Sequence, residues 1–188
     1  MSVKWSVFDK LIAALRFNNV KNKVPRNSIL CDLGCGFNGD FLKAMAPVII
    51  KGYGFDRKVI NVTIDNIILH SVNNLENGIP AEDESVDCVT MLAMLEHLDQ
   101  PDKILQEGSR ILKQGGMFIL TTPPPISKKL LEFLAFRLKI ISEEEIRDHK
   151  VYYNRKDIVT LLTKHGYKEI YVRRFMLGFN QLAVGTKS

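Results

Sequence analysis

Residues 29–42 read ILCDLGCGFNGDFL, an apolar run that ends in an acid, passes through glycines and resumes with helical spacing. This order predicts a β-strand, a tight loop and the start of a helix, the first half of a nucleotide-binding βαβ unit. Gly34 and Gly36 let the backbone approach a ligand closely because neither residue carries a Cβ atom. The helix that follows is expected to direct its free N–H groups towards the same ligand.

Two classes of nucleotide-binding loop fit these glycines. Gly34, Gly36 and Gly39 satisfy the G-x-G-x-x-G pattern of dinucleotide-binding folds, and Asp56 follows at about the separation of ~20 residues that those folds use. Asp32, however, precedes the first glycine at a position where a dinucleotide-binding strand usually carries an apolar side chain. An acid at this position instead suits a ligand with a cationic amino group.

Further apolar runs predict a doubly wound α/β fold. The predicted strands, besides the first, span residues 48–55, 66–72, 86–91, 117–122, 167–175 and 179–186. The predicted helices span residues 5–17, 102–112 and 153–165, the first with apolar positions at Trp5, Phe8, Leu11, Ile12 and Leu15. Gly115 and Gly116 are expected to cap the second of these helices. Residues 57–65 are few and β-branched, so a crossover helix there is expected to shrink to about one turn.

Composition limits the class of protein. A chain of 188 residues, 46% hydrophobic and 25% charged, is long enough for a single domain over residues 1–188 and too short for two of ordinary size. No apolar run approaches the ~20 residues of a membrane span, and no secretory signal begins the chain. Cys31, Cys35 and Cys88 are expected to be buried, reduced thiols of a cytoplasmic protein. The net charge of +5 comes from scattered basic residues without interleaved aromatics, so a nucleic-acid partner is not expected.

Polar groups follow two of the predicted strands, at the sheet edge where such folds bind ligands. Asp56 ends the strand over residues 48–55, and a carboxylate there can accept both hydroxyls of a ribose, although it could also cap a helix or lie at the surface. Asn74 and Leu75 follow the next strand and can pair with an adenine edge, the first by its amide and the second by its backbone N–H. An ordinary turn around Asn77 is the alternative.

These motifs together resemble the class I S-adenosylmethionine (SAM)-dependent methyltransferases, in particular the small-molecule domain called type 11. The resemblance runs from about residue 29 to the C-terminus and is carried, in order, by residues 32–39, 56, 79–87, 95–98 and 110–116. Asn38 departs from the family pattern, which has glycine there, but asparagine tolerates left-handed backbone geometry. The resemblance implies a three-layer αβα sandwich with a seven-stranded sheet of order 3-2-1-4-5-7-6, its last strand antiparallel.

The same resemblance implies SAM as cofactor and a set of residues that hold it. Asp32, Gly34 and Gly36 would hold the methionine end, Asp56 the ribose, and Asn74 with Leu75 the adenine. The full set of implied cofactor-binding residues is Asp32, Gly34, Cys35, Gly36, Asp56, Arg57, Asn74 and Leu75. The acceptor would be a small molecule, such as a sugar or a lipid-linked biosynthetic intermediate. A catalytically inactive SAM-binding partner or regulatory subunit is the alternative.

His97 and His149 are the candidate bases for a hydroxyl or amine acceptor, because imidazole titrates near neutral pH. His97 could equally line the pocket, and His149 could lie in a surface loop. Ubiquinone-pathway O-methyltransferases have a similar stretch around Glu96 and His97, with a further glutamate that helps to hold a metal. Ala93 stands at that position here and has no ligand atom, so no metal is expected.

Residues 126–147 form an unusually apolar insert above the predicted ligand-binding edge. A helix over residues 127–141 would carry a narrow polar stripe of Lys128, Glu132, Ala135 and Lys139, with large apolar side chains on its other sides. Such a helix is too apolar to be fully solvated. It is expected to form a lid over the substrate, the contact of a homodimer, or a peripheral contact with a membrane surface.

Overall fold

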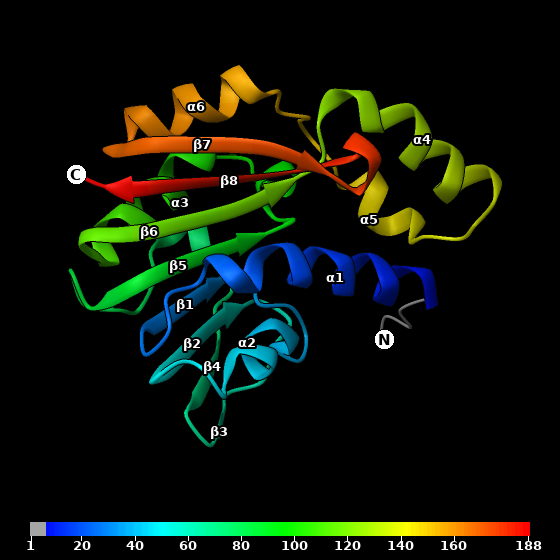
Figure 1. Ribbon diagram of the computed structural model, residues 1–188. Coiled ribbons are helices and arrows are strands. Elements are labelled where there is room, and N and C mark those ends of the chain that lie inside the picture. The colour runs from blue at the N-terminus through cyan, green and yellow to red at the C-terminus, as the bar shows by residue number, and fades with distance from the viewer. Residues whose placement is uncertain (1–6) are drawn as a thin grey trace.

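A computed structural model describes residues 7–188, apart from the side chains of residues 7 and 145 (Figure 1). Its eight strands form one sheet in the order β3-β4-β2-β1-β5-β6-β8-β7. The strands are β1 (Ile29–Leu33), β2 (Lys51–Asp56), β3 (Val62–Ile64), β4 (Ile67–Ser71), β5 (Val86–Leu92), β6 (Leu112–Thr122), β7 (Tyr167–Phe175) and β8 (Asn180–Lys187). The helices are α1 (Val7–Val20), α2 (Asp40–Met45), α3 (Pro101–Ile111), α4 (Lys128–Glu132), α5 (Glu143–Arg147) and α6 (Arg155–Lys164).

The strand order confirms the expected sheet and adds one strand to it. Without β3, the order is the one that the resemblance implies, and β8 is antiparallel to both of its neighbours, β6 and β7. The pairs β1–β2, β1–β5, β2–β4 and β5–β6 are parallel. Their carboxyl ends therefore meet at one edge of the sheet, where an open α/β sheet binds ligands.

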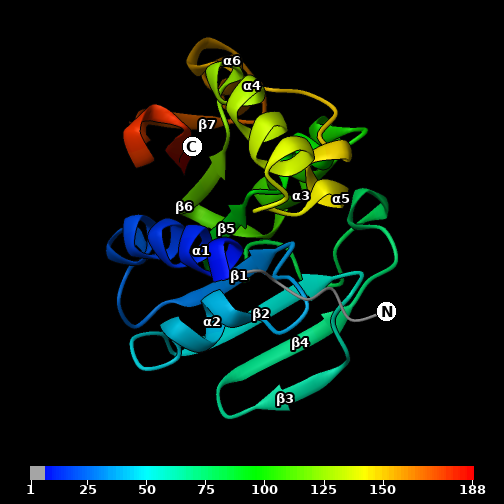
Figure 2. The same cartoon turned by 90° about the vertical axis from the view of Figure 1, so that its right-hand side faces the viewer.

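Helices cover both faces of the sheet, giving three layers. Phe41, Leu42 and Met45 of α2 and Val20 of α1 are buried in one cluster with sheet residues. The opposite cluster holds buried residues of α3 and α6, among them Ile104 and Ile158. Figure 2 shows α1 on one side of the sheet and α3 on the other. Alternate residues of β1 face opposite clusters, since Leu30 belongs to the first and Cys31 to the second.

Two local predictions are wrong. No helical turn follows β2; instead the β-branched residues of β3 pair antiparallel with β4, because such side chains favour an extended backbone. Gly115 and Gly116 do not cap α3, which ends at Ile111, because the buried Leu112 is already extended and pairs with Val86. Gly115, with a φ of 73°, lies where the register of β6 shifts against β5.

Helix α1 buries a different side from the one that its apolar spacing predicts. Phe8, Leu11 and Leu15 are 41%, 52% and 40% exposed, while Ala13 and Val20 are buried. Trp5 lies outside the described residues. The helix is anchored near its C-terminal end, where the Phe17 and Phe41 rings lie 5.2 Å apart, and its other half extends past the strand ends (Figure 1).

The apolar insert is two short helical segments rather than one helix. The α4 helix continues into the π-helical turn η5 (Phe133–Arg137), and α5 follows after a break in which Lys139 has a φ of 53°. The sequence spacing assigns Ala135 to the polar stripe, but the structure buries it. Phe133 and Leu138, expected on the apolar side, are about half exposed. The insert lies beyond the carboxyl ends of β5 and β6 (Figure 1). Among the described residues, no helix has the length and apolar character of a membrane span.

Gly54 of β2 is predicted to be a sensitive packing position. A Cβ atom there would lie 2.6 Å from Leu69 Cδ2, 2.8 Å from Leu42 Cδ1 and 2.9 Å from Cys35 Sγ. Gly54→Ala should therefore lower the free energy of unfolding by about 1–3 kcal/mol, measured by chemical denaturation. Gly52→Ala, whose nearest contact would be 3.1 Å, is the matched variant and should cost less. If Gly54→Ala lowered the free energy of unfolding no more than Gly52→Ala does, this packing would be contradicted.

Candidate active site

The loop after β1 is held against the end of β2 by backbone hydrogen bonds. The N–H groups of Gly34 and Cys35 donate to the carbonyl of Phe55 at 2.9 and 3.2 Å, and the N–H of Gly36 donates to Asp56 Oδ2 at 2.9 Å. The other carboxylate oxygen of Asp56 accepts from the N–H of Lys58 at 2.7 Å. Asp56 thus fixes the glycine loop from its position at the carboxyl end of β2.

The glycines of this loop have backbone conformations that other residues rarely adopt. Gly34 and Gly36 have φ values of 73° and 72°. A Cβ atom on Gly34 would lie 2.6 Å from Met94 Sδ, so the loop packs against the segment that follows β5. A Cβ atom on Gly36 would meet nothing within 4 Å, so open space lies beside that glycine. The third left-handed residue is Gly39, with a φ of 62°, and not Asn38.

Asp32 lies buried at the base of the loop and accepts a hydrogen bond from Thr90 Oγ1 at 2.6 Å. Burial raises the pKa of its carboxyl to about 7, against the lowering effect of the Thr90 bond, and the charge of Asp56 raises it further. Cys35 is buried beside it, and burial raises the pKa of that thiol too. As expected, Cys31, Cys35 and Cys88 are all buried and free.

The remaining cofactor candidates lie near Asp56. The carbonyl of Asp56 accepts from the N–H of Val72, which brings the end of β4 and the following Asn74 and Leu75 to the same edge. Asn74 is exposed, and its side-chain oxygen caps the turn η2 (Leu75–Asn77) by accepting from the N–H of Glu76 at 2.9 Å. Leu75 is buried, and Arg57 is exposed directly after β2.

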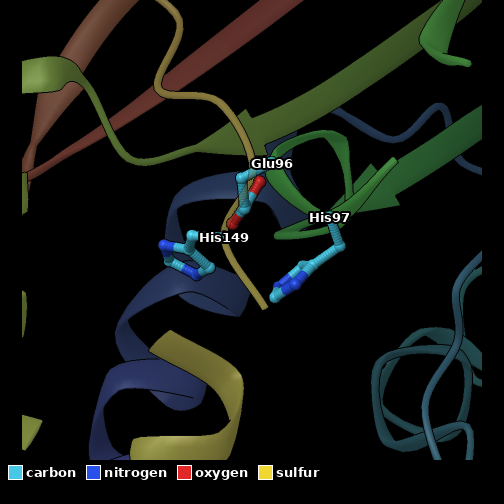
Figure 3. A group of neighbouring side chains, drawn as sticks. All are labelled: Glu96, His97 and His149. Atoms are coloured by element: carbon cyan, nitrogen blue, oxygen red, sulfur yellow. The ribbon is translucent and has the colours of Figure 1, made fainter. Parts of the chain in front are cut away.

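Both candidate histidines meet beside a buried carboxylate. Glu96 and His97 lie on η3 (Leu95–His97), after the carboxyl end of β5, and His149 follows α5 (Figure 3). The two imidazole rings lie 4.8 Å apart between centroids, at 76° to one another. The N–H of Lys150 donates to the carbonyl of Glu96 at 2.8 Å, which ties the two segments together. Because η3 begins directly after Met94, the cluster lies close to the glycine loop that packs on Met94.

Each member of this cluster has a hydrogen-bonding partner outside it. His97 Nδ1 lies 3.0 Å from Asp148 Oδ2, and because a carboxylate only accepts, this nitrogen carries the hydrogen. His149 Nδ1 lies 3.0 Å from the hydroxyl of Tyr152. The hydroxyl of Thr122, at the end of β6, donates to Glu96 Oε2 at 2.8 Å. The Nδ1 atoms of both rings are therefore engaged, which fixes the ring orientations.

Burial shifts the pKa values of two members. It lowers the pKa of His149 to about 4, with the charges of His97 and Arg16 acting in the same direction and Asp148 opposing them. It raises the pKa of Glu96, while His97, Thr122 and Arg16 lower it. His149 is consequently neutral near pH 7, which leaves a ring nitrogen with a free lone pair.

The sequence singles out both histidines but misses the residues that organise them. Asp148, Tyr152 and Thr122 lie far from His97 in the chain or carry no pattern of their own, and only the fold brings them together. Glu96 could be noticed in the sequence, because it is adjacent to His97 and lies in the stretch 95–98 that contributes to the family resemblance.

Comparison with known proteins agrees with the fold. A family model described as a methyltransferase domain matches residues 7–172. A ubiquinone/menaquinone biosynthesis C-methyltransferase, UbiE, from Brucella canis is 26% identical over 151 residues, which are 72% of this chain and 55% of that protein. A ubiquinone biosynthesis O-methyltransferase from Colwellia psychrerythraea is 28% identical over 150 residues, 74% of this chain and 60% of that protein. The chain thus spans little more than half the length of these relatives.

Solved structures share the architecture. An S-adenosylmethionine-dependent methyltransferase from Mesorhizobium loti superposes with a TM-score of 0.71 at 15% identity, covering 94% of this chain and 100% of that one. A Haloferax volcanii protein, solved in complex with the Trm112 methyltransferase activator, superposes with a TM-score of 0.74 at 17% identity, covering 95% and 92%. Because the family model covers most of the sequence, the chain belongs to this family of methyltransferase domains, a class I fold whose cofactor is S-adenosylmethionine.

Proposed function

We propose that this domain transfers a methyl group from SAM to a small-molecule acceptor bound beside Glu96, His97 and His149. The observation that carries the proposal is the packing of Gly34 against Met94, which puts the cofactor loop next to the segment bearing Glu96 and His97. SAM supplies a methyl group already activated by its sulfonium sulfur, so the protein has mainly to orient the acceptor and exclude water.

The residues of the loop fit this cofactor. Open space beside Gly36 leaves room for its methionine portion, and the ionised Asp32 provides a negative charge for the amino group. Asp56 has two carboxylate oxygens, each with further lone pairs beyond its bond to the loop, and would accept the ribose hydroxyls. Asn74 and Leu75 would meet the adenine, with Cys35 and Arg57 flanking the methionine portion and the ribose.

His97 and His149 are the proposed catalytic residues. Their Nδ1 atoms have partners, so Nε2 is the nitrogen that each ring can turn towards an acceptor. The names of the relatives, a C-methyltransferase and an O-methyltransferase, favour an acceptor that reacts at an oxygen or at an activated carbon. The insert over residues 126–147 leads directly into Asp148 and His149, so we assign it the role of a wall or lid of the acceptor pocket. The three free thiols favour a cytoplasmic location.

Incubation with SAM labelled in its methyl group and a metabolite extract tests this function. Label should appear in a small molecule and S-adenosylhomocysteine should accumulate. Calorimetric titration with SAM, and with a nicotinamide dinucleotide as the competing cofactor class, is the companion measurement. Tight SAM binding without transfer to any acceptor would contradict the enzymatic proposal and support a non-catalytic SAM-binding partner.

The pKa of Asp32 predicts a pH dependence of cofactor binding. Its carboxyl is protonated below about pH 7, and binding of a cationic amino group favours the ionised form, so binding should release a proton. The affinity for SAM should therefore fall by up to about tenfold per pH unit as the pH drops from about 7 to about 5.5. Calorimetry across this range measures the slope. Asp32→Asn cannot ionise and should bind weakly at every pH with a flatter profile, and an unchanged slope in this variant would contradict the assignment.

A further inference from the structure

Glu96, His97 and His149 each offer one ligand atom, and these atoms all lie within 4.8 Å of one another (Figure 3). We propose that these three residues bind a divalent first-row transition-metal ion, of which Zn²⁺ is the best match. Zinc ligands lie about 2.0–2.2 Å from the ion, so binding would draw the three side chains closer together. The proposal rests on the proposed function and specifies how the two histidines act there: they hold the metal ion that binds the methyl acceptor, in place of acting as free bases.

The hydrogen bonds around the cluster are those of a metal site. A histidine that binds a metal usually donates its other ring N–H to a carboxylate or another oxygen, which fixes the ring and leaves one nitrogen for the ion. His97 has this arrangement with Asp148 at 3.0 Å, and His149 Nδ1 lies 3.0 Å from the Tyr152 hydroxyl. Thr122 orients the carboxylate of Glu96 in the same way. His97 and Glu96 are thus held by side chains from distant segments of the chain, and His149 by a tyrosine three residues after it.

The donor set selects the kind of metal. Two imidazole nitrogens and one carboxylate oxygen suit Zn²⁺ and neighbouring transition metals, whereas Mg²⁺ and Ca²⁺ prefer oxygen ligands alone. Ala93 provides no ligand, and the sequence therefore predicts no metal here. His149 changes that expectation, because the fold brings a third donor from a segment that no local motif connects to Glu96.

The open coordination position indicates what the metal would hold. Glu96, His97 and His149 supply three ligands, one fewer than the four of a tetrahedral zinc site. An oxygen of the acceptor, from a hydroxyl or an enol, would occupy the fourth position. We therefore assign the site an acceptor that binds metal through oxygen.

Metal binding can be measured directly on the whole chain. Tag-free protein is treated with chelator, dialysed, and titrated with CoCl₂ while the d–d absorption is followed, and with ZnCl₂ by calorimetry. One ion should bind per chain, with the visible bands of a site containing nitrogen ligands. His149→Asn and His97→Asn should each weaken binding by at least about 100-fold. Asp148→Asn, which removes only the partner of His97, should weaken it by about tenfold.

His165→Gln is the matched control. His165 pairs with Asp102 through Nε2 at 2.6 Å and is not part of the cluster, so its loss should leave metal binding unchanged. Glu96 is buried, and its replacement risks unfolding, so the test depends on the two histidine variants with thermal unfolding as the check of their fold. Equal binding by wild type and His149→Asn, or no binding by wild type, would overturn the proposal.

Failure of this inference can be told apart from failure of the proposed function. SAM binding is measured separately on the metal-free protein and depends on the loop after β1. Protein that binds SAM and transfers its methyl group, but binds no metal, would refute the metal site alone. Protein that binds neither SAM nor an acceptor would refute the proposed function, whatever its affinity for Co²⁺.

Discussion

Replacing Asp56 by alanine should weaken SAM binding by at least about 100-fold, as measured by calorimetry. The variant loses the acceptor for the ribose hydroxyls, and hydrogen bonds to a charged group contribute about 1.5–3 kcal/mol each. It also frees the N–H of Gly36, which donates to Asp56 Oδ2 at 2.9 Å and holds the loop in its left-handed conformation. The two losses act on the same ligand and should reinforce one another.

Asp56→Asn separates these contributions. Its amide oxygen can still accept from the N–H of Gly36, so the loop should stay in place while the negative charge is lost. Its affinity for SAM should lie between those of wild type and Asp56→Ala. Wild-type affinity in the alanine variant would show that the ribose is bound elsewhere.

Replacing His97 by asparagine should lower kcat by about 10²–10³-fold and change the Kd for SAM by less than about twofold. The ring contacts Asp148 and lies beside His149, while the residues proposed to hold SAM belong to other loops. The loss should therefore fall on the step that involves the acceptor. His165→Gln, which removes a histidine paired with Asp102, is the control and should keep full turnover.

A pure wall residue would give a different result. If His97 only shaped the pocket, His97→Asn should raise the KM for the acceptor and leave kcat nearly unchanged. Equal turnover by wild type and variant at saturating acceptor would remove His97 from the catalytic machinery.

The glycine loop and the positions of most strands could be predicted because they depend on local patterns. Glycines at 34 and 36 followed by an acid at 56 define a βαβ unit by their spacing alone. Buried parallel strands also give long apolar runs that stand out in the sequence. The strand order itself came from family resemblance, since no local pattern encodes which strands are neighbours.

The errors came where tertiary contacts override local pattern. Phe8, Leu11 and Leu15 have helical spacing, yet α1 packs through Ala13, Phe17 and Val20 because only its C-terminal half lies over the sheet. Gly115 is a residue type that often caps helices, but here it lies where the register of β6 shifts against β5. Both positions satisfy a local rule, and packing of distant segments decides the outcome.

The candidate active site was predictable only in part for the same reason. His97 and His149 could be chosen by residue type, because few side chains titrate near neutral pH. The two imidazole rings lie 4.8 Å apart between centroids, and their partners are Asp148 and Tyr152. This arrangement depends on how residues after α5 pack against η3. A short motif cannot report such a long-range contact.

A crystal structure of the chain with S-adenosylhomocysteine bound is the most direct test of the cofactor loop and its neighbouring cluster as one active site. The ribose hydroxyls should bind the carboxylate of Asp56, the amino acid portion should lie beside Gly36, and the sulfur should face Glu96, His97 and His149. A ligand bound away from the carboxyl ends of β1 and β2, or oriented with its sulfur away from this cluster, would contradict the assignment.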